Sequence, residues 1–335
     1  MTHIAAFSKF LAYEIGGAEI STRELLTVES KKGKRITIIS MENAHFLGKP
    51  VPKAKLLNNW QLKFIYSTIQ LSRFGYVEYI LNRNRIKKYF SYFKADELWA
   101  YGIMGPAAIL GFHGQKCFFI RSESDLGIIG NYLSGIKKIG KKLYVMFESP
   151  ASLIYRYDLK KALFESRVIA NSNYMAKKTN DIFGIKPEVK YPPVNIKKIR
   201  EKLAAIKTKE RWVVFVGDSS YKGFDLVLDI AQCLQNINFR IFSRFVNKQH
   251  TKGNILWTPW QRDSWRVYEG ACLVIVPSQW NEAYGRIARE SYLLGIPVLV
   301  SKTGGLPETV EYNNECIIRE FSQASSWITA IKSIL

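Results

Sequence analysis

The order of apolar and polar residues along the chain constrains its fold more than any other feature. Short apolar runs alternate with longer segments of helical periodicity, which is the pattern of β-α-β units around a parallel sheet. In the first half, the pattern predicts a helix over residues 18–30, after a loop that contains Gly16 and Gly17. It also predicts buried strands at residues 4–7, 35–40, 97–101, 117–121, 142–147 and 167–170.

The second half repeats this alternation. A helix is predicted to start near Gly285 and to end at Gly295. Strands are predicted at residues 212–216, 239–242, 255–257, 273–276 and 297–300. Each half is therefore expected to form a doubly wound sheet, and ligands of such sheets bind outside the carboxyl ends of the strands. The predicted class is α/β, with two Rossmann-like domains that face each other across a cleft.

The boundary between the halves is marked by Pro192 and Pro193, followed by a polar, lysine-rich segment over residues 196–211. Two consecutive prolines exclude a helix and fit only a strand edge or a linker. A chain of 335 residues is also long for one hydrophobic core. We therefore predict two domains, one over residues 1–195 and one over residues 196–335.

The charge of the chain is strongly basic, with 49 Lys and Arg against 28 Asp and Glu, a net charge of +21. Such an excess implies an anionic partner, whether nucleic acid, a membrane or a phosphorylated substrate. No helix-turn-helix, RRM-like aromatic motif or zinc finger accompanies it, so a nucleic-acid-binding protein is only a remote alternative.

Basic clusters at residues 31–35, 83–88 and 137–142 lie beside aromatic-rich segments at residues 56–81 and 89–93. This combination suits the interface of an anionic membrane, although solvated lysines over ordinary core helices would give the same pattern. The first residues lack the features of a signal peptide. We expect a cytoplasmic protein, peripheral at the inner face of the cell membrane.

Two glutamates frame a helix start in the second half. A predicted strand ends at Val276, a loop carries Glu282, and the helix that begins near Gly285 carries Glu290. The free N–H groups of a helix N-terminus favour phosphate, and glycine lets a ligand approach closely. On a continuous helix the two glutamates would be about 12 Å apart. That exceeds the spacing of about 5–9.5 Å in glycosidase acid/base pairs. They suit hydroxyls on different parts of one extended ligand, or they are solvated surface residues.

This stretch resembles the E-x7-E signature of the retaining glycosyltransferases of family 4, which have the two-domain GT-B fold. The similarity extends over about 30 residues. It includes Pro277, Ser278, Trp280, Glu282, Gly285, Glu290 and residues 295–298 and 301–308. Upstream, residues 216–225 resemble the strand–loop–helix that carries the family's phosphate-binding lysine, here Lys222 before Gly223. The pair Gly16–Gly17 resembles the family's donor-facing glycine loop.

The resemblance implies a retaining, metal-independent hexosyltransferase. Residues 1–195 would form its acceptor-side domain and residues 196–335 its nucleotide-sugar-binding domain. Its donor would be a UDP- or GDP-linked sugar, its acceptor a cell-envelope glycan or a lipid-linked molecule, and it would need no cofactor. The chain contains no D-x-D motif, which fits metal independence. A nucleotide-sugar epimerase or another non-transferase enzyme of the same fold is the alternative.

The resemblance also implies roles for single residues. Lys222 and the helix N-terminus would neutralise the leaving diphosphate, while Glu282 contacts the sugar and Glu290 the ribose. Lys222 and Glu282 are the predicted catalytic residues. The predicted donor-binding residues are Gly16, Gly17, Lys222, Arg244, Glu282, Ala283, Tyr284, Gly285, Arg286 and Glu290.

The sequence departs from the family in two places. Asp218 stands where the family usually has an arginine, so another cation is needed near the diphosphate. The candidates are Arg244, Arg262 and Arg286. On the acceptor side the family's histidines are absent. Glu123 or Asp125 could contact an acceptor hydroxyl or cap a helix, and His113 is expected to be structural.

Overall fold

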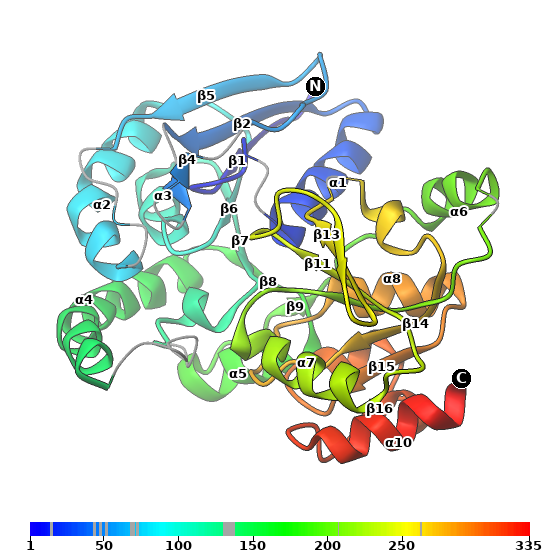
Figure 1. Ribbon diagram of the computed structural model, residues 1–335. Helices are drawn as coiled ribbons and strands as arrows, with labels where there is room; N and C mark the ends of the chain where they lie inside the picture. Colours follow the sequence, from blue (N-terminus) through cyan, green and yellow to red (C-terminus); the bar gives the residue numbers. More distant parts are fainter. Residues whose placement is uncertain are drawn as a thin grey trace. The chain divides into compact units, whose positions relative to one another are not determined.

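Two compact units make up the chain, an N-terminal unit, Met1–Pro193, and a C-terminal unit, Val194–Leu335. Each holds a twisted sheet with helices packed on it (Figure 1). The computed structural model describes residues 1–13, 16–42, 45–46, 49–50, 53–67, 71, 74–129, 138–206, 208–261 and 263–335, with backbone only at residues 45–46, 49–50 and 138–143.

The sheet of the N-terminal unit has seven strands in the order β5-β2-β1-β6-β7-β8-β9, and all neighbours are parallel. Its strands are β1 (His3–Phe7), β2 (Arg35–Met41), β5 (Gln61–Ile65), β6 (Glu97–Tyr101), β7 (Gln115–Ile120), β8 (Arg167–Ala170) and β9 (Glu188–Val189). Two short strands, β3 (His45–Phe46) and β4 (Lys49–Pro50), pair with each other. The strand order reverses between β1 and β6.

Helices cover both faces of this sheet. They are α1 (Gly17–Lys31), α2 (Gly75–Tyr92), α3 (Gly105–Gly111), η1 (Glu123–Leu126), α4 (Lys138–Phe164) and α5 (Asn173–Phe183). Successive side chains of β1 point to opposite faces of the sheet, so they pack in two different apolar cores. Ile4 and Ala6 join Leu26 of α1 in one cluster, whereas the ring of Phe7 meets Phe90 of α2 with centroids 5.1 Å apart.

The C-terminal unit has a second seven-stranded sheet, in the order β12-β13-β11-β10-β14-β15-β16. Only its edge strand β12 is antiparallel. The strands are β10 (Trp212–Val216), β11 (Phe239–Ser243), β12 (His250–Lys252), β13 (Ile255–Pro259), β14 (Ala271–Val276), β15 (Val298–Ser301) and β16 (Ile317–Ile318). Here the strand order reverses between β10 and β14.

The helices of the C-terminal unit form a layer on each face of its sheet. They are α6 (Ile196–Ala204), η2 (Ser220–Lys222), α7 (Phe224–Cys233), η3 (Ser264–Val267), α8 (Arg286–Leu294), α9 (Leu306–Thr309), η4 (Asn314–Cys316) and α10 (Ala324–Ile334). Val213 and Phe215 pack with α7 and α10, which lie side by side in Figure 1. Val214 packs on the opposite face with α6 and α8. The predicted α/β class with two parallel-sheet domains is confirmed.

One predicted strand is wrong. Residues 142–147 lie inside α4, a helix of 27 residues, and do not form a strand. Val145, Met146 and Phe147 point to solvent although they are apolar, so this stretch is apolar on both faces and its helical period is hidden. The sequence also did not indicate β5, β9, β12 and β16, which are mostly exposed or two-residue strands at or near the sheet edges.

None of the helices in the described ranges is both long and apolar enough to cross a membrane.

Candidate functional site

Two loops of the C-terminal unit meet where its strand order reverses, which is the place where open α/β sheets bind ligands. Residues 217–223 follow β10, and residues 277–285 follow β14. The backbone N–H of Gln279 donates to the carbonyl of Tyr221 at 2.8 Å, and the rings of Tyr221 and Trp280 meet edge to face at 5.2 Å. The two loops are therefore joined by a backbone bond and an aromatic contact.

A third loop, after β15, supports the backbone of Glu282. The N–H of Gly305 donates to the carbonyl of Glu282 at 2.7 Å. Gly304 has φ +54°, and a Cβ there would lie 2.1 Å from the same carbonyl oxygen. Only glycine permits this approach, because a larger residue would push the Glu282 backbone away.

Lys222 and Glu282 contact each other directly. The Lys222 Nζ lies 2.5 Å from the Glu282 Oε1, which also accepts from the Ser278 hydroxyl at 2.7 Å. Burial raises the pKa of Glu282, but the charge and hydrogen bonds of Lys222 and the Ser278 bond outweigh burial, so its pKa lies below the usual value. A lysine has three N–H donors. Since the Lys222 side chain is one-third exposed, its remaining donors can reach an anion.

Gly285 places the N-terminus of α8 next to this pair. It is the N-cap residue with φ +120°, and it offers no side-chain cap. This φ is one that L side chains rarely adopt, and a Cβ at this position would also lie 2.4 Å from the Leu306 Cδ2, so the position favours glycine. The first-turn N–H groups of α8 can therefore serve an anion. Ala283 is half-buried and Tyr284 is buried in the preceding loop.

Glu290 is completely buried on the inner side of α8. Its Oε2 accepts from the Tyr268 hydroxyl at 2.6 Å, and its Oε1 accepts from the Arg286 Nε. Burial, the Glu290 charge and this hydrogen bond raise the pKa of Tyr268 well above its usual value. Both carboxylate oxygens thus contact protein, one of them through Arg286, whose side chain is 12% exposed. Tyr268 belongs to no motif that the sequence analysis could have recognised.

The structure describes two of the three candidate cations, Arg244 and Arg286. Asp218 accepts the backbone N–H of Arg244 at 3.0 Å, so the acid in the family's arginine position orders the loop that carries Arg244. The Arg244 guanidinium lies over the Trp260 ring at 4.6 Å and the residue is exposed. Arg286 contacts Glu290. Arg262 lies outside the described residues.

The glycine pair of the N-terminal unit begins α1. Gly16 is the N-cap and Gly17 the first helical residue. Arg121, just after β7, donates to the Ala18 carbonyl at 2.8 Å, and its guanidinium lies over the Tyr101 ring at 4.6 Å. Arg121 therefore holds the start of α1 near the carboxyl end of the sheet, a role that the sequence analysis missed.

The predicted acceptor-side residues have different environments. Glu123 accepts from the Tyr174 hydroxyl at 2.5 Å. Asp125 is buried and accepts the backbone N–H of Ser122 at 3.0 Å as part of a capping box of η1. The capping alternative is therefore correct for Asp125. His113 is exposed between α3 and β7.

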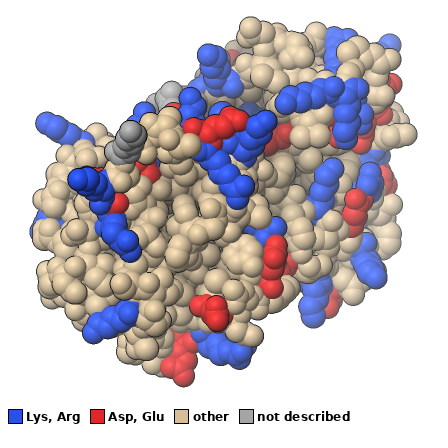
Figure 2. Space-filling model, turned by 90° about the vertical axis from the view of Figure 1, so that its right-hand side faces the viewer, with Lys and Arg blue, Asp and Glu red and all other residues tan. Residues whose placement is uncertain are grey.

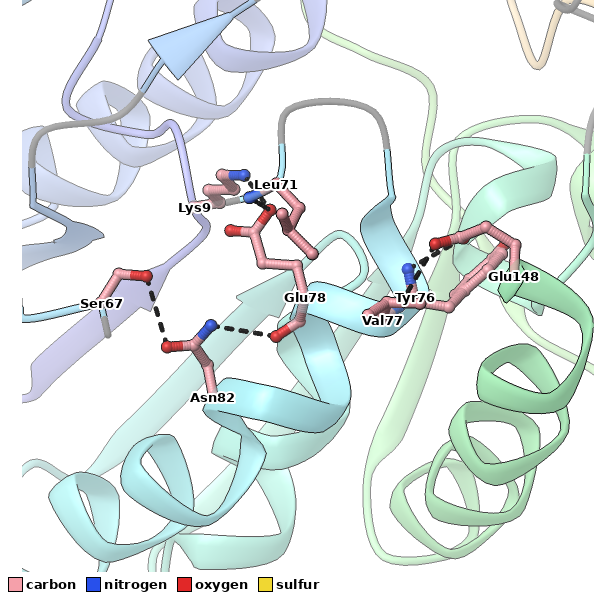
Figure 3. Close-up of polar contacts among 8 residues, drawn as sticks. All are labelled: Lys9, Ser67, Leu71, Tyr76, Val77, Glu78, Asn82 and Glu148. Atoms are coloured by element: carbon pink, nitrogen blue, oxygen red, sulfur yellow. Dashed lines mark hydrogen bonds and ion pairs between the residues drawn. The ribbon is translucent and has the colours of Figure 1, made fainter. Parts of the chain in front are cut away.

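A buried ion pair that the sequence analysis did not single out lies beyond the end of β1 (Figure 3). The Lys9 Nζ contacts the Glu78 Oε2 at 2.6 Å, and the Leu71 N–H donates to the same oxygen at 3.1 Å. The Glu78 Oε1 is buried and has no hydrogen-bond partner within the described ranges. Burial raises the pKa of Glu78 despite the opposing charge of Lys9. Because 69 residues separate the two, no local pattern predicts this pair.

A second buried carboxylate in Figure 3 caps α2 from a different helix. Glu148 of α4 accepts the backbone N–H groups of Tyr76 at 3.0 Å and Val77 at 3.3 Å. These are orphan donors of the first helical turn, where negative charge is favourable.

We expect Glu148→Gln to lower the free energy of unfolding by about 1–2 kcal/mol, because it removes the charge from a buried helix cap. Urea unfolding measures the change. The control is Glu165→Gln, which alters a half-exposed ion pair with Lys116 just after α4 and should cost less than about 1 kcal/mol. Equal losses in the two variants would contradict the capping role.

The chain is similar in sequence to known proteins. Residues 195–335 match the family model "Glycosyl transferases group 1". D-inositol 3-phosphate glycosyltransferase of Corynebacterium kroppenstedtii is 35% identical over 68 residues, which is 20% of this chain and 15% of that enzyme. An uncharacterized 41.2 kDa protein in the cps region of Klebsiella pneumoniae is 26% identical over 63% of this chain and 67% of that protein. The chain therefore matches only a small part of the first of these relatives.

Solved structures extend the similarity to the whole chain. Sucrose-phosphate synthase of Thermosynechococcus elongatus has a TM-score of 0.72 at 16% identity, covering 100% of this chain and 90% of that one. HepE of Anabaena in complex with UDP-glucose has a TM-score of 0.64 at 14% identity, covering 99% and 89%. Identities this low show the fold alone. The chain thus has the GT-B fold of glycosyltransferases, and its C-terminal unit matches the group 1 glycosyltransferase family, which together support a transferase enzyme.

Proposed function

We propose that the chain is a retaining, metal-independent glycosyltransferase. It moves a hexosyl group from a nucleotide sugar to a cell-envelope glycan or a lipid-linked acceptor. The Lys222–Glu282 contact carries the proposal, because it lies at the strand reversal of the unit that matches the group 1 family. There it offers an ammonium group to a diphosphate and a carboxylate to a sugar hydroxyl.

The leaving diphosphate would lie against Lys222 and the N-terminus of α8 at Gly285. Both groups stabilise the negative charge that develops as the sugar departs. Arg244 would supply the second cation, from the loop that Asp218 orders through its backbone bond. Arg244 would thus supply the positive charge that the family usually obtains from an arginine at the position of Asp218.

Glu282 would bind the donor sugar as a carboxylate. Its lowered pKa keeps it ionised at neutral pH, so it accepts hydrogen bonds from sugar hydroxyls and is not a general acid. The acceptor hydroxyl would attack the anomeric carbon on the face from which the diphosphate leaves, and its proton would pass to the departing diphosphate, so that the configuration is retained.

Glu290 would bind the ribose of the nucleotide. Its Oε1 contacts Arg286, which is the first residue of α8 and is partly exposed. A ribose hydroxyl that replaces the Arg286 Nε would donate a hydrogen bond to the buried oxygen, and it would free Arg286 for the diphosphate. The bond from Tyr268 keeps the carboxylate oriented during this exchange.

The donor is proposed to be UDP- or GDP-linked. The similarity in fold to HepE, whose structure holds UDP-glucose, favours a UDP-linked sugar.

The acceptor is proposed to lie at the inner face of the cell membrane, where the protein binds peripherally. The net charge of +21 supports an anionic surface as partner. On the face drawn in Figure 2, Lys and Arg side chains are spread out with Asp and Glu between them. That face therefore shows no single basic stripe of the kind that tracks a nucleic-acid backbone.

A thermal-shift panel of UDP, GDP, ADP and their sugars tests the proposal. One nucleoside diphosphate is expected to raise the melting temperature, since a ligand at 100 times its dissociation constant adds about 2.7 kcal/mol. Glu290→Gln should abolish the shift, whereas Glu201→Gln, an exposed glutamate of α6, should keep it. If no nucleotide stabilises the protein and Glu290→Gln behaves as wild type, the proposal fails.

A further inference from the structure

The outward face of α4 is apolar where a surface helix is normally polar. Met146, Phe147, Leu153, Tyr157 and Phe164 are each 57–68% exposed, and Ile154 is 42% exposed. We call these six residues the outer face of α4. Val145 of α4 is also exposed, at 38%, and the remaining exposed large apolar side chains lie on other parts of the chain, such as Tyr92 at the end of α2 and Phe245 after β11. Single residues of that kind are normal on a protein surface, but a contiguous patch marks an interaction site.

Helical geometry makes these residues one stripe. Met146, Leu153, Tyr157 and Phe164 are spaced by seven, four and seven residues, so they line the same side of the helix. The stripe runs for roughly 27 Å at 1.5 Å per residue. The opposite side of α4 faces the protein, since Tyr155 and Leu159 are fully buried. The helix is therefore apolar on both sides, and only the inner side has a partner within the described chain.

The charged side chains of residues 144–164 also lie on different sides of α4, with the cations toward solvent and the acids toward the protein. Arg156, Lys160 and Lys161 are exposed. The two acids of residues 144–164 are Glu148 and Asp158, and both are buried. Asp158 accepts from the Tyr79 hydroxyl at 2.8 Å and pairs with Arg83 at 3.0 Å. Toward solvent, this part of α4 thus presents apolar side chains and cations only.

The exposed cations of α4 favour one of two candidate partners for its outer face. The candidates are a second copy of the chain and a lipid surface. In a symmetric dimer the outer face would pack on its own copy, which would bring two sets of Arg156, Lys160 and Lys161 into one interface without an exposed acid from residues 144–164 to neutralise them. An anionic lipid surface instead neutralises these cations while its acyl region takes the apolar side chains. Tyr157 suits this boundary, because the Lys161 Nζ lies 4.3 Å from its ring centroid, which puts an amphipathic ring beside a cation.

We propose that the outer face of α4 docks on a membrane surface rich in anionic phospholipids, with α4 lying in the interface plane. Leu153, Tyr157 and Phe164 enter the boundary between headgroups and acyl chains, and Lys160 and Lys161 contact lipid phosphates. The inference rests on the proposed function, which puts a lipid-linked acceptor at the same membrane. It assigns the docking to α4, whereas the sequence pattern pointed to the aromatic segments at residues 56–81 and 89–93.

Vesicle co-sedimentation tests the docking surface. The full chain is expected to bind phosphatidylcholine vesicles that contain phosphatidylglycerol and to be released by high salt. The double variant Leu153→Glu, Tyr157→Glu should bind at least about tenfold more weakly. Lys160→Glu with Lys161→Glu should lose the dependence on phosphatidylglycerol. The control, Tyr92→Glu, changes an exposed aromatic residue of α2 and should bind as wild type.

Two further measurements separate the possible outcomes. Melting temperatures of the variants without ligand, which should match wild type, show that the outward substitutions leave the fold intact. The nucleotide thermal shift depends on the C-terminal unit, so vesicle binding without any nucleotide shift would overturn only the proposed function. Wild-type binding by the Leu153, Tyr157 variant would overturn the docking proposal. So would a dimer in solution that this variant dissociates, because the outer face would then be a protein interface.

Discussion

Lys222→Met is expected to weaken nucleoside diphosphate binding by about 10- to 100-fold, because it removes one charge-assisted hydrogen bond worth about 1.5–3 kcal/mol. It should also lower the free energy of unfolding. Glu282 is 9% exposed, and the substitution leaves its carboxylate without its cation. Since Lys222 itself is one-third exposed, the expected loss is about 1–3 kcal/mol, less than for a fully buried pair. Calorimetric titration and urea unfolding measure the two effects.

The double variant Lys222→Met, Glu282→Gln separates stability from function. Removing the carboxylate also removes the uncompensated charge, so the unfolding free energy should recover toward wild type. Nucleotide binding should stay weak, because the cation is still missing. A double variant that regains nucleotide affinity would show that Lys222 serves only to neutralise Glu282.

Gly223→Ala should disrupt the proposed donor site, because the added methyl group would clash with backbone. Gly223 has φ +85°, and its Cβ would lie 2.1 Å from the Pro277 carbonyl oxygen and 2.8 Å from the Pro277 carbonyl carbon. The Pro277 backbone must move, and with it the loop that carries Ser278 and Glu282. We expect a loss of more than about 4 kcal/mol in unfolding free energy, together with loss of the nucleotide thermal shift.

Gly295→Ala is the matched control. Gly295 ends α8 with a similar φ of +76°, but nothing lies within 4 Å of its Cβ position. Left-handed strain alone costs about 1–2 kcal/mol, and the nucleotide shift should remain. If the two alanine variants lose the same stability, the close contact between Gly223 and Pro277 does not matter to the fold.

The strands that the sequence predicts correctly are mainly those buried on both faces. Residues 4–7, 212–216 and 273–276 are continuous apolar runs because helices cover both sides of each sheet. The edge strand β12 has no buried residue, so it leaves no apolar pattern to detect. Residues 143–147 form a similar apolar run, but they lie in α4, where Val145, Met146 and Phe147 are exposed to solvent.

Local sequence predicts part of the geometry of the proposed donor site. The strand end at Val276, the loop with Glu282 and the helix between Gly285 and Gly295 lie within 20 residues, so the motif predicts them together. The contact between Lys222 and Glu282 spans 60 residues, and sequence alone places the two only at the ends of neighbouring strands. The burial of Glu290 against Tyr268 follows from the packing of α8, which no spacing rule describes.

The sequence by itself determined the α/β alternation of both units and the glycine-bounded helix α8. These are properties of short segments, where local dihedral preferences and apolar periodicity decide the structure. Only the tertiary structure decided which charges meet, which is why Lys222 pairs with Glu282 and Lys9 with Glu78. It also decided which apolar side chains stay outside. Burial depends on what the rest of the chain covers, and nothing within the described chain covers the outer face of α4.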